Sequence, residues 1–189
     1  VSVDGGFADV SQYNLDSGKT VYLSGEWEFF WNKHLISDKT GRASHKDFVQ
    51  VPASWTTYEI NGKKLPNGGK ASYRTYLENI YTTKPFVVSV PCVSGECNVF
   101  INGKWVFSNR NIPGTEYSTV IESYAIPYAA EGDGPIDCEV VIEVTCENSS
   151  GLTSVPTLST YEKFHSSEMG TLAKRYFYIG IVLFIAVAV

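Results

Sequence analysis

The chain has 189 residues and a formal net charge of −5, with 43% hydrophobic, 14% aromatic and 19% charged residues. This length suffices for one domain of roughly 150 residues plus a tail, and so rich an aromatic content excludes a disordered chain and favours strands over helices. No basic run exceeds two residues, which argues against the positively charged surface that a nucleic-acid partner requires.

Short runs of alternating polarity, separated by glycine, asparagine and proline, dominate the chain. The clearest run spans residues 21–31. Side chains alternate between the two faces of a strand. Three aromatic residues are therefore expected on its core face: Trp27, Phe29 and Trp31. Glu26 and Glu28 are expected on the opposite, solvated face.

Further strands are predicted at intervals along the rest of the chain. They cover residues 48–55, 72–77, 86–93, 98–107, 137–145 and 157–163. Pro52 breaks the first of these strands, because proline cannot donate to a sheet. The polar segment 32–47 is expected to be a loop with a short helix near residues 34–36. Residues 59–70 hold two Asn-Gly pairs and are expected to form an exposed loop.

The segment 98–107 has the pattern of a hairpin. Its Asn-Gly pair at residues 102–103 supplies the positive φ angles that a two-residue type I′ turn demands. That turn places Phe100 opposite Trp105 and Val99 opposite Val106. We expect the Trp105 ring to lie in the core.

About eight short strands indicate an all-β fold, an antiparallel β-sandwich of jelly-roll or similar topology. A parallel α/β sheet would need crossover helices, and no segment has that pattern. No internal repeat indicates a solenoid or a propeller. We expect residues 1–163 to form one β-sandwich sensor or binding domain.

The end of the sequence has a different character. Residues 176–189 are uncharged and almost wholly apolar, although crossing a bilayer takes about 20 such residues. We interpret this run as the start of a transmembrane helix and residues 164–175 as a membrane-proximal linker; a buried C-terminal element remains the alternative. Lys174 and Arg175 would favour a cytoplasmic domain under the positive-inside rule, but folded domains translocate largely regardless of such charges.

Four cysteines allow several pairings. Cys138 and Cys146 lie in one predicted strand, about 26 Å apart at roughly 3.3 Å per residue, so they cannot bond to each other. Cys92 and Cys97 flank a plausible bend and are the candidate disulfide, which would leave the other two as buried thiols. Cysteines in this number suggest an oxidising compartment.

No pattern of residues indicates catalysis or a metal site. The three histidines, His34, His45 and His165, lack ligand spacing and are expected in solvated loops. Glu26 and Glu28 share a face, but a solvated surface explains them better than a pair of glycosidase carboxylates. We therefore predict no catalytic residue, no metal and no cofactor. Calcium is common in jelly rolls, but no acidic loop nominates a structural calcium site.

The order of several short motifs resembles two known families. The motifs are FADVSQY at 7–13, LSGEWEFFW at 23–31, VPASW at 51–55, ASYR at 71–74, VFINGK at 99–104 and the strand that ends at Asn148. Together, over residues 7–163, they resemble the N-terminal extracellular domain of bacterial seven-transmembrane receptors with diverse intracellular signalling modules. They are also similar to the sugar-binding domain of β-galactosidase-like glycoside hydrolases. Both resemblances imply a galactose-binding-like jelly roll.

Candidate ligand-binding residues lie around the loop 59–70 and after the hairpin. Sugar sites use aromatic faces with a few directed hydrogen bonds. The candidates are Trp55, Tyr58, Tyr73, Arg74, Asn109 and Arg110, with Asn111 beside them. The alternative for each residue is a structural role instead of ligand binding. Trp55 would be a core ring or loop anchor, and Arg74 would form an ion pair with a sandwich carboxylate.

The sequence leads us to expect a ligand-sensing domain, extracytoplasmic and carried by the cell membrane. It would belong to a signalling receptor such as a sensor histidine kinase or a cyclase, with an unknown small molecule or glycan as ligand and a receptor dimer left open. The alternative is a non-catalytic sugar-binding domain of a glycoside hydrolase. A purely structural surface domain is the third hypothesis.

Overall fold

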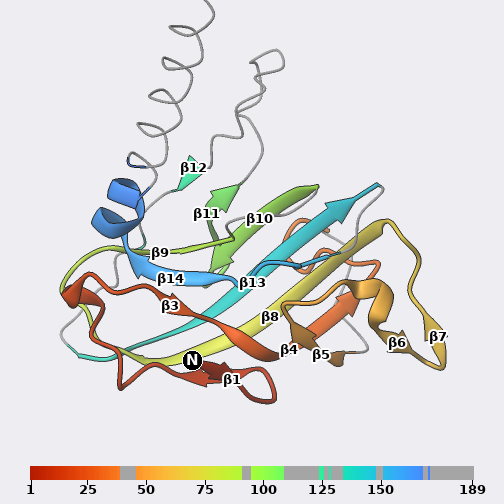
Figure 1. Cartoon of the computed structure of the whole chain (residues 1–189), viewed down its shortest axis with the longest axis horizontal. Helices are drawn as coiled ribbons and strands as arrows, with labels where there is room; N and C mark the ends of the chain where they lie inside the picture. The colour runs from red at the N-terminus through yellow and green to blue at the C-terminus, as the bar shows by residue number, and fades with distance from the viewer. Residues whose placement is uncertain are drawn as a thin grey trace, which may run out of the picture.

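The computed structural model describes residues 1–38, 46–90, 95–108, 124–125, 128, 134–147, 151–167 and 170. These residues form two facing β-sheets and a small hairpin, which confirms the predicted all-β sandwich (Figure 1). The large sheet has nine strands: β1 (Ser2–Val3), β2 (Phe7–Asp9), β4 (Ser24–Trp31), β5 (Asp47–Val51), β8 (Gly69–Ile80), β10 (Glu96–Ile101), β11 (Lys104–Ser108), β12 (Tyr124–Ala125) and β13 (Ile136–Cys146). The small sheet has three: β3 (Val21–Tyr22), β9 (Phe86–Ser89) and β14 (Thr157–Thr160).

The strand order of the large sheet is β1-β4-β8-β13-β10-β11-β12, with β2 beside β8 and β5 beside β4. The small sheet has the order β3-β14-β9. Short 3₁₀ turns, η1 (Leu15–Ser17) and η2 (Trp55–Thr57), connect strands. A helix over residues 161–167 follows β14. The predicted final strand thus ends at Thr160, and its last residues are helical.

Two strand pairs, β1–β4 and β2–β8, are parallel, so the large sheet is not purely antiparallel as predicted. The reason is local. Strands β4 and β8 pair only over Glu28–Trp31 and Ala71–Arg74, and the N-terminal segment lies where they separate. Gly6 bridges the gap, because its N–H donates to the Glu26 carbonyl (2.9 Å) and its carbonyl accepts from the Tyr76 N–H (2.8 Å).

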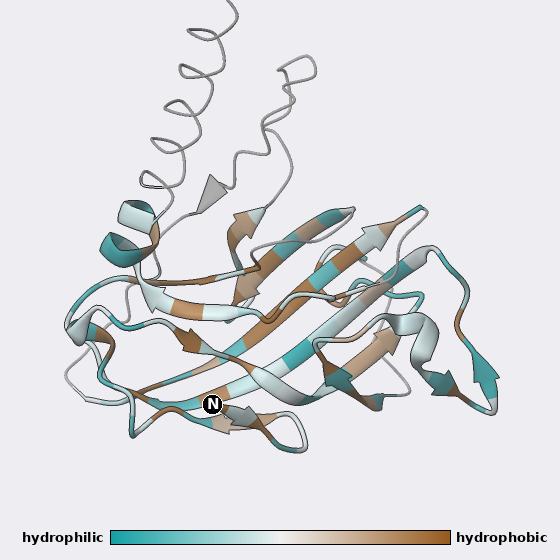
Figure 2. Cartoon of the chain, in the orientation of Figure 1, coloured by the Kyte–Doolittle hydropathy of each residue, from teal (hydrophilic) through white to brown (hydrophobic). Residues whose placement is uncertain are grey.

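Alternation along the central strands places the core between the two sheets. Tyr73, Leu77, Val140 and Ile142 face inward from β8 and β13 and are fully buried. Figure 2 shows the alternation as brown and teal bands along β13. Trp27 and Phe29 are in the core as predicted. Trp31 is only partly buried, packed against the core.

The β10–β11 hairpin confirms part of the predicted register. Asn102 and Gly103 both have positive φ, 49° and 74°, and Phe100 lies opposite Trp105. Val99 lies opposite Phe107 rather than Val106, because a bulge shifts the register there. Trp105 is 37% exposed, which corrects its predicted core position. Since its partner Phe100 faces away from the second sheet, Trp105 does too.

The expected exposed loop 59–70 is more ordered than its composition suggests. It contains a two-stranded hairpin, β6 (Glu59–Ile60) and β7 (Lys63–Lys64), around Asn61 and Gly62 with φ of 51° and 73°. Leu65 follows and is buried in the core. The buried Leu65 side chain therefore holds the hairpin against the domain.

The apolar segment 176–189 lies outside the described residues, so its prediction as a membrane helix stays a prediction. Within the ranges that the structure describes, no helix is both long and apolar enough to cross a bilayer.

Candidate functional site

Three of the predicted ligand residues are core side chains. The rings of Trp55 and Tyr73 are fully buried and Tyr58 is 8% exposed. Their polar atoms are used internally: Trp55 Nε1 donates to the Pro66 carbonyl (3.0 Å), and Tyr58 Oη donates to the Gln50 carbonyl (2.7 Å). Burial raises the pKa of both tyrosines. The three rings therefore lie in the core and not at the expected rim, and the Trp55 bond to Pro66 attaches the loop 59–70 to the core.

Arg74, the fourth candidate, lies on the outer face of the large sheet. Its Nε donates to Glu28 Oε2 (2.6 Å) and its Nη1 to Glu139 Oε1 (3.4 Å). The guanidinium carbon lies 5.0 Å from the ring centre of Phe30 and 5.4 Å from that of Tyr76, which is within cation–π range. The structural interpretation of Arg74, an ion pair with a sandwich carboxylate, is confirmed.

The prediction that Glu28 lies on a solvated face is wrong, because only 2% of the residue is exposed. Arg74 covers it on one side, and Lys46 Nζ pairs with its other oxygen. The backbone of Gly6 covers it as well, since a Cβ there would lie 2.9 Å from Glu28 Cγ. The parallel N-terminal strands therefore bury this carboxylate, and the alternation pattern of β4 alone could not indicate that.

Residues 33–38, which we call the strap, lie over the same outer face. Glu143 on β13 is 1% exposed. Its carboxylate accepts the N–H groups of Ile36 (2.6 Å) and Ser37 (3.1 Å) and the Ser37 hydroxyl (2.5 Å). His34 Nε2 lies 3.2 Å from Thr145 Oγ1. His34 is therefore held against the sheet, which corrects its predicted position in a solvated loop.

The remaining predicted candidates are only partly described. Asn109, Arg110 and Asn111, His45 and the Cys92 half of the candidate disulfide lie outside the described residues. Cys138 and Cys146 are buried thiols as predicted. Burial raises the pKa of Cys138 to about 12, so its thiol is a poor nucleophile at neutral pH. The described ranges contain no group of three or more His, Cys, Asp or Glu side chains that could hold a metal ion.

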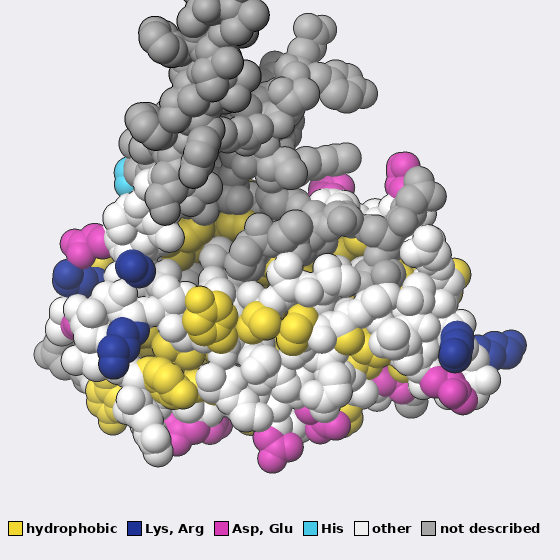
Figure 3. Space-filling model, in the orientation of Figure 1, with side chains coloured by type: hydrophobic (Ala, Val, Ile, Leu, Met, Phe, Trp, Pro, Cys, Tyr) yellow, Lys and Arg dark blue, Asp and Glu magenta, His cyan; other side chains and the backbone are white. Residues whose placement is uncertain are grey.

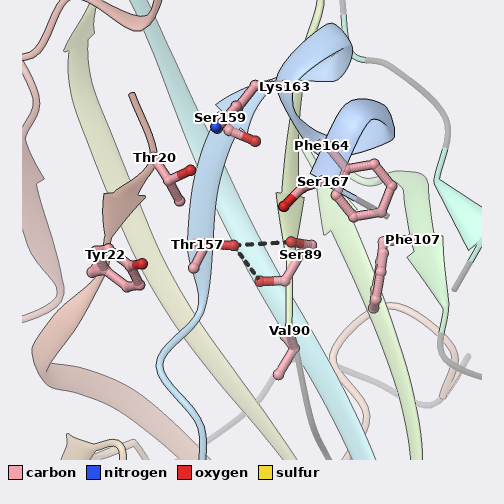
Figure 4. Close-up of a pocket in the computed structure, with 10 residues that line it drawn as sticks. All are labelled: Thr20, Tyr22, Ser89, Val90, Phe107, Thr157, Ser159, Lys163, Phe164 and Ser167. Atoms are coloured by element: carbon pink, nitrogen blue, oxygen red, sulfur yellow. Dashed lines mark hydrogen bonds between the residues drawn. The ribbon is translucent and has the colours of Figure 1, made fainter. Parts of the chain in front are cut away.

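A pocket of about 240 Å³ lies over the outer face of the small sheet (Figure 4). Residues 161–167 form one wall, and β3, β9 and β14 form the floor. Five lining residues carry aliphatic hydroxyls: Thr20, Ser89, Thr157, Ser159 and Ser167. The other five are Tyr22, Val90, Phe107, Lys163 and Phe164.

The floor of the pocket is fixed by the pairing of β9 and β14. Thr157 lies directly opposite Ser89, and their hydroxyls are 2.9 Å apart and hydrogen-bonded. Phe164 packs edge-on against Phe107, with ring centres 6.5 Å apart, which attaches the helix to the end of β11. Tyr22 stands at the rim and is 59% exposed.

The face that carries the pocket has few charges at its middle. Figure 3 shows hydrophobic and uncharged polar atoms in the centre of this face and charged side chains toward its margins. Neutral hydroxyls, one exposed aromatic ring and apolar walls are the lining that sugar rings require. The sequence analysis did not predict this pocket. The pattern that could have indicated it is the strand TLST at 157–160, which carries hydroxyl residues on its outward face.

Comparison with known proteins informs the fold. No protein-family model and no curated protein matches the sequence. Among solved structures, the chain is similar to the β-glucuronidase of Ruminococcus gnavus, with a TM-score of 0.54 and 16% identity over 75% of this chain and 29% of that chain. The complex of that enzyme with D-glucuronic acid gives a TM-score of 0.53 and 17% identity over the same shares. The shared feature is a β-sandwich.

At this identity the likeness concerns the fold alone. The chain spans less than a third of the length of the glycoside hydrolase chains that it matches. The similarity to glycoside hydrolase sandwiches expected from the motifs is therefore present at the level of fold. No matching family model supports the similarity to receptor domains, which stays a prediction.

Proposed function

We propose that this chain is a non-catalytic carbohydrate-binding β-sandwich. The observation that carries the proposal is the pocket on the small sheet, where hydroxyls line the floor and the exposed ring of Tyr22 stands at the rim. A sugar ring presents apolar C–H groups on its faces and hydroxyls at its edge, so an aromatic rim beside hydroxyl groups suits it. The occurrence of this fold within a glycoside hydrolase chain supports the same function.

One pair of neighbouring carboxylates supports a role without catalysis. Glu28 and Glu139 flank one guanidinium, Arg74, and Glu28 is almost wholly buried. A pair of glycosidase carboxylates has to stand on either side of a space for the sugar. Here the arginine occupies that space.

The test is a glycan array followed by titration calorimetry with the 189-residue chain. We expect at least one saccharide to bind, and Tyr22→Ala to weaken its affinity about tenfold, since ring contacts of this kind contribute about 0.5–1.5 kcal/mol beyond area burial. Tyr81→Ala is the matched control, because Tyr81 is 49% exposed and does not line the pocket. Loss of binding in both variants, or in neither, would contradict the proposal.

A membrane-carried sensor is the second candidate, favoured by the apolar run at 176–189 and by the resemblance to receptor domains. In it, the saccharide-binding sandwich would be extracytoplasmic and would report to a kinase or cyclase output across the membrane. Flotation with lipid vesicles distinguishes the two candidates. We expect the full chain to float and a variant without 176–189 to remain at the bottom; equal behaviour would remove the support that the apolar run gives.

A further inference from the structure

We propose that the pocket on the small sheet selects a saccharide that bears an anionic group, a carboxylate or a sulfate. This inference rests on the proposed carbohydrate-binding function and specifies its ligand class. It follows from the charge of the lining. Among the ten described residues that line the pocket, Lys163 is the one cation and none bears a carboxylate. A neutral hydroxyl-lined pocket with a single ammonium group favours an anion by charge complementarity.

The ammonium group of Lys163 is available to a ligand. Within the part of the chain that the structure describes, Lys163 Nζ has neither an ion pair nor a hydrogen bond. Its neighbour in the helix, Glu162, is engaged elsewhere, because its carboxylate accepts from Lys84 Nζ (2.7 Å). The helix therefore supplies the pocket with a cation and directs its adjacent carboxylate to a different lysine.

Two hydroxyls of the lining are also available. Ser89 and Thr157 satisfy each other, but the side chains of Ser159 and Thr20 have no hydrogen-bond partner among the described residues. Ser159 is only 4% exposed. Because Ser159 lines the pocket, its hydroxyl can bond to water or to a ligand there, and toward an anion it donates a charge-assisted hydrogen bond.

These groups stand together around one cavity (Figure 4). Ser159 comes from β14 and Lys163 from the helix that follows it, four residues later. Thr20 and the Tyr22 ring come from the neighbouring strand region. A carboxylate or sulfate beside Lys163 and Ser159 would leave the sugar ring between the hydroxyl floor and Tyr22.

The test compares matched saccharides by titration calorimetry on the full chain. The pairs are glucuronic acid with glucose, galacturonic acid with galactose, and N-acetylglucosamine 6-sulfate with N-acetylglucosamine. Sodium acetate and sodium sulfate serve as free anions. We expect the acidic member of at least one pair to bind about tenfold or more tightly than its neutral partner, because hydrogen bonds to charged groups are the stronger ones.

Lys163→Gln should abolish the preference for the acidic sugar by lowering its affinity to that of the neutral sugar, and Ser159→Ala should weaken the acidic sugar more than the neutral one. Lys63→Gln, on the distant β6–β7 hairpin, is the matched control and should behave as the parent chain. Equal binding of acidic and neutral sugars, unaffected by Lys163→Gln, would overturn this inference and leave the proposed function standing. Binding of the free anions as tight as that of the sugars would also overturn it. If no saccharide binds, the proposed function fails and this inference with it.

Discussion

The two outer faces of the sandwich use polar residues in opposite ways. On the large sheet, Glu28, Arg74 and Glu143 bond to other protein groups, and the first and last are nearly inaccessible. On the small sheet, Ser159 and Lys163 line a pocket and have no partner among the residues that the structure describes. In the amino-acid sequence, the outward positions named on both faces look alike, because all of them are polar.

The difference shows how to distinguish structural polarity from binding polarity. A buried charge is tolerable only when paired and hydrogen-bonded, and the outer face of the large sheet meets that condition with its own residues. A hydroxyl on a pocket lining and an exposed ammonium, neither bonded to a described residue, leave hydrogen bonds for a ligand to make. Substitutions should therefore destabilise the first face strongly and the second weakly.

The largest effect is expected from Arg74→Met. The substitution leaves Glu28 buried with Lys46 as its remaining cation, and breaking a buried pair in this way costs about 3 kcal/mol of the free energy of unfolding. Urea denaturation measures it. Changing Glu28 to Met as well should recover much of the loss, because no uncompensated charge then remains. If the free energy of unfolding of Arg74→Met lies within about 1 kcal/mol of the parent value, the Glu28–Arg74 ion pair does not stabilise the fold.

A smaller loss is expected from Glu143→Gln. This carboxylate accepts three hydrogen bonds from Ile36 and Ser37, and weakening bonds to a charged acceptor should lower the free energy of unfolding by about 1–2 kcal/mol. Hydrogen exchange at the amides of Ile36 and Ser37 should accelerate. Glu139→Gln is the control, since its side chain is 28% exposed, and it should leave those two amides protected.

Acid should loosen the strap. The hydrogen bond from Lys70, followed by that from the His34 N–H, lowers the pKa of Asp38 below its usual 3.8. A carboxylate with a depressed pKa contributes stability at and above pH 4, and this contribution disappears as the pH falls through the folded-state value. Urea midpoints at pH 5 and pH 3 should therefore differ less in Asp38→Asn than in the parent chain. An equal difference would show that Asp38 has no part in the acid response.

The smallest effect on stability is expected in the pocket. Ser159→Ala and Lys163→Gln remove groups that bond to no described residue, so each should change the free energy of unfolding by no more than about 0.5 kcal/mol. Thermal unfolding measures the change. A loss above about 1 kcal/mol from Lys163→Gln would mean that the ammonium has a structural partner and that the two faces use their polar residues in the same way.

Alternation predicted much of the sandwich because a strand with one buried face needs apolar residues at every second position. The inward-facing Trp27 and Phe29 and the turn at residues 102–103 followed from that pattern and from turn chemistry. The same pattern failed for Trp105, because alternation tells which residues share a face and not which face meets the second sheet.

The candidate site was harder to predict. Aromatic residues near a loop, such as Trp55 and Tyr73, have the composition of both a sugar rim and a core, and only packing separates the two. The pocket residues Thr20, Ser89 and Ser159 come from three distant segments and carry no motif. Their proximity depends on which strands pair, and local patterns do not contain that information.

The sequence by itself determined the strand-rich composition, the core faces of the central strands and the hairpin turn, because these depend on neighbouring residues along the chain. The tertiary structure alone decided that Glu28 is buried with Arg74, that Trp55 belongs to the core, and that Ser159 and Lys163 face one pocket. Long-range strand pairing sets which side chains meet, and with it which polar groups find a partner within the protein.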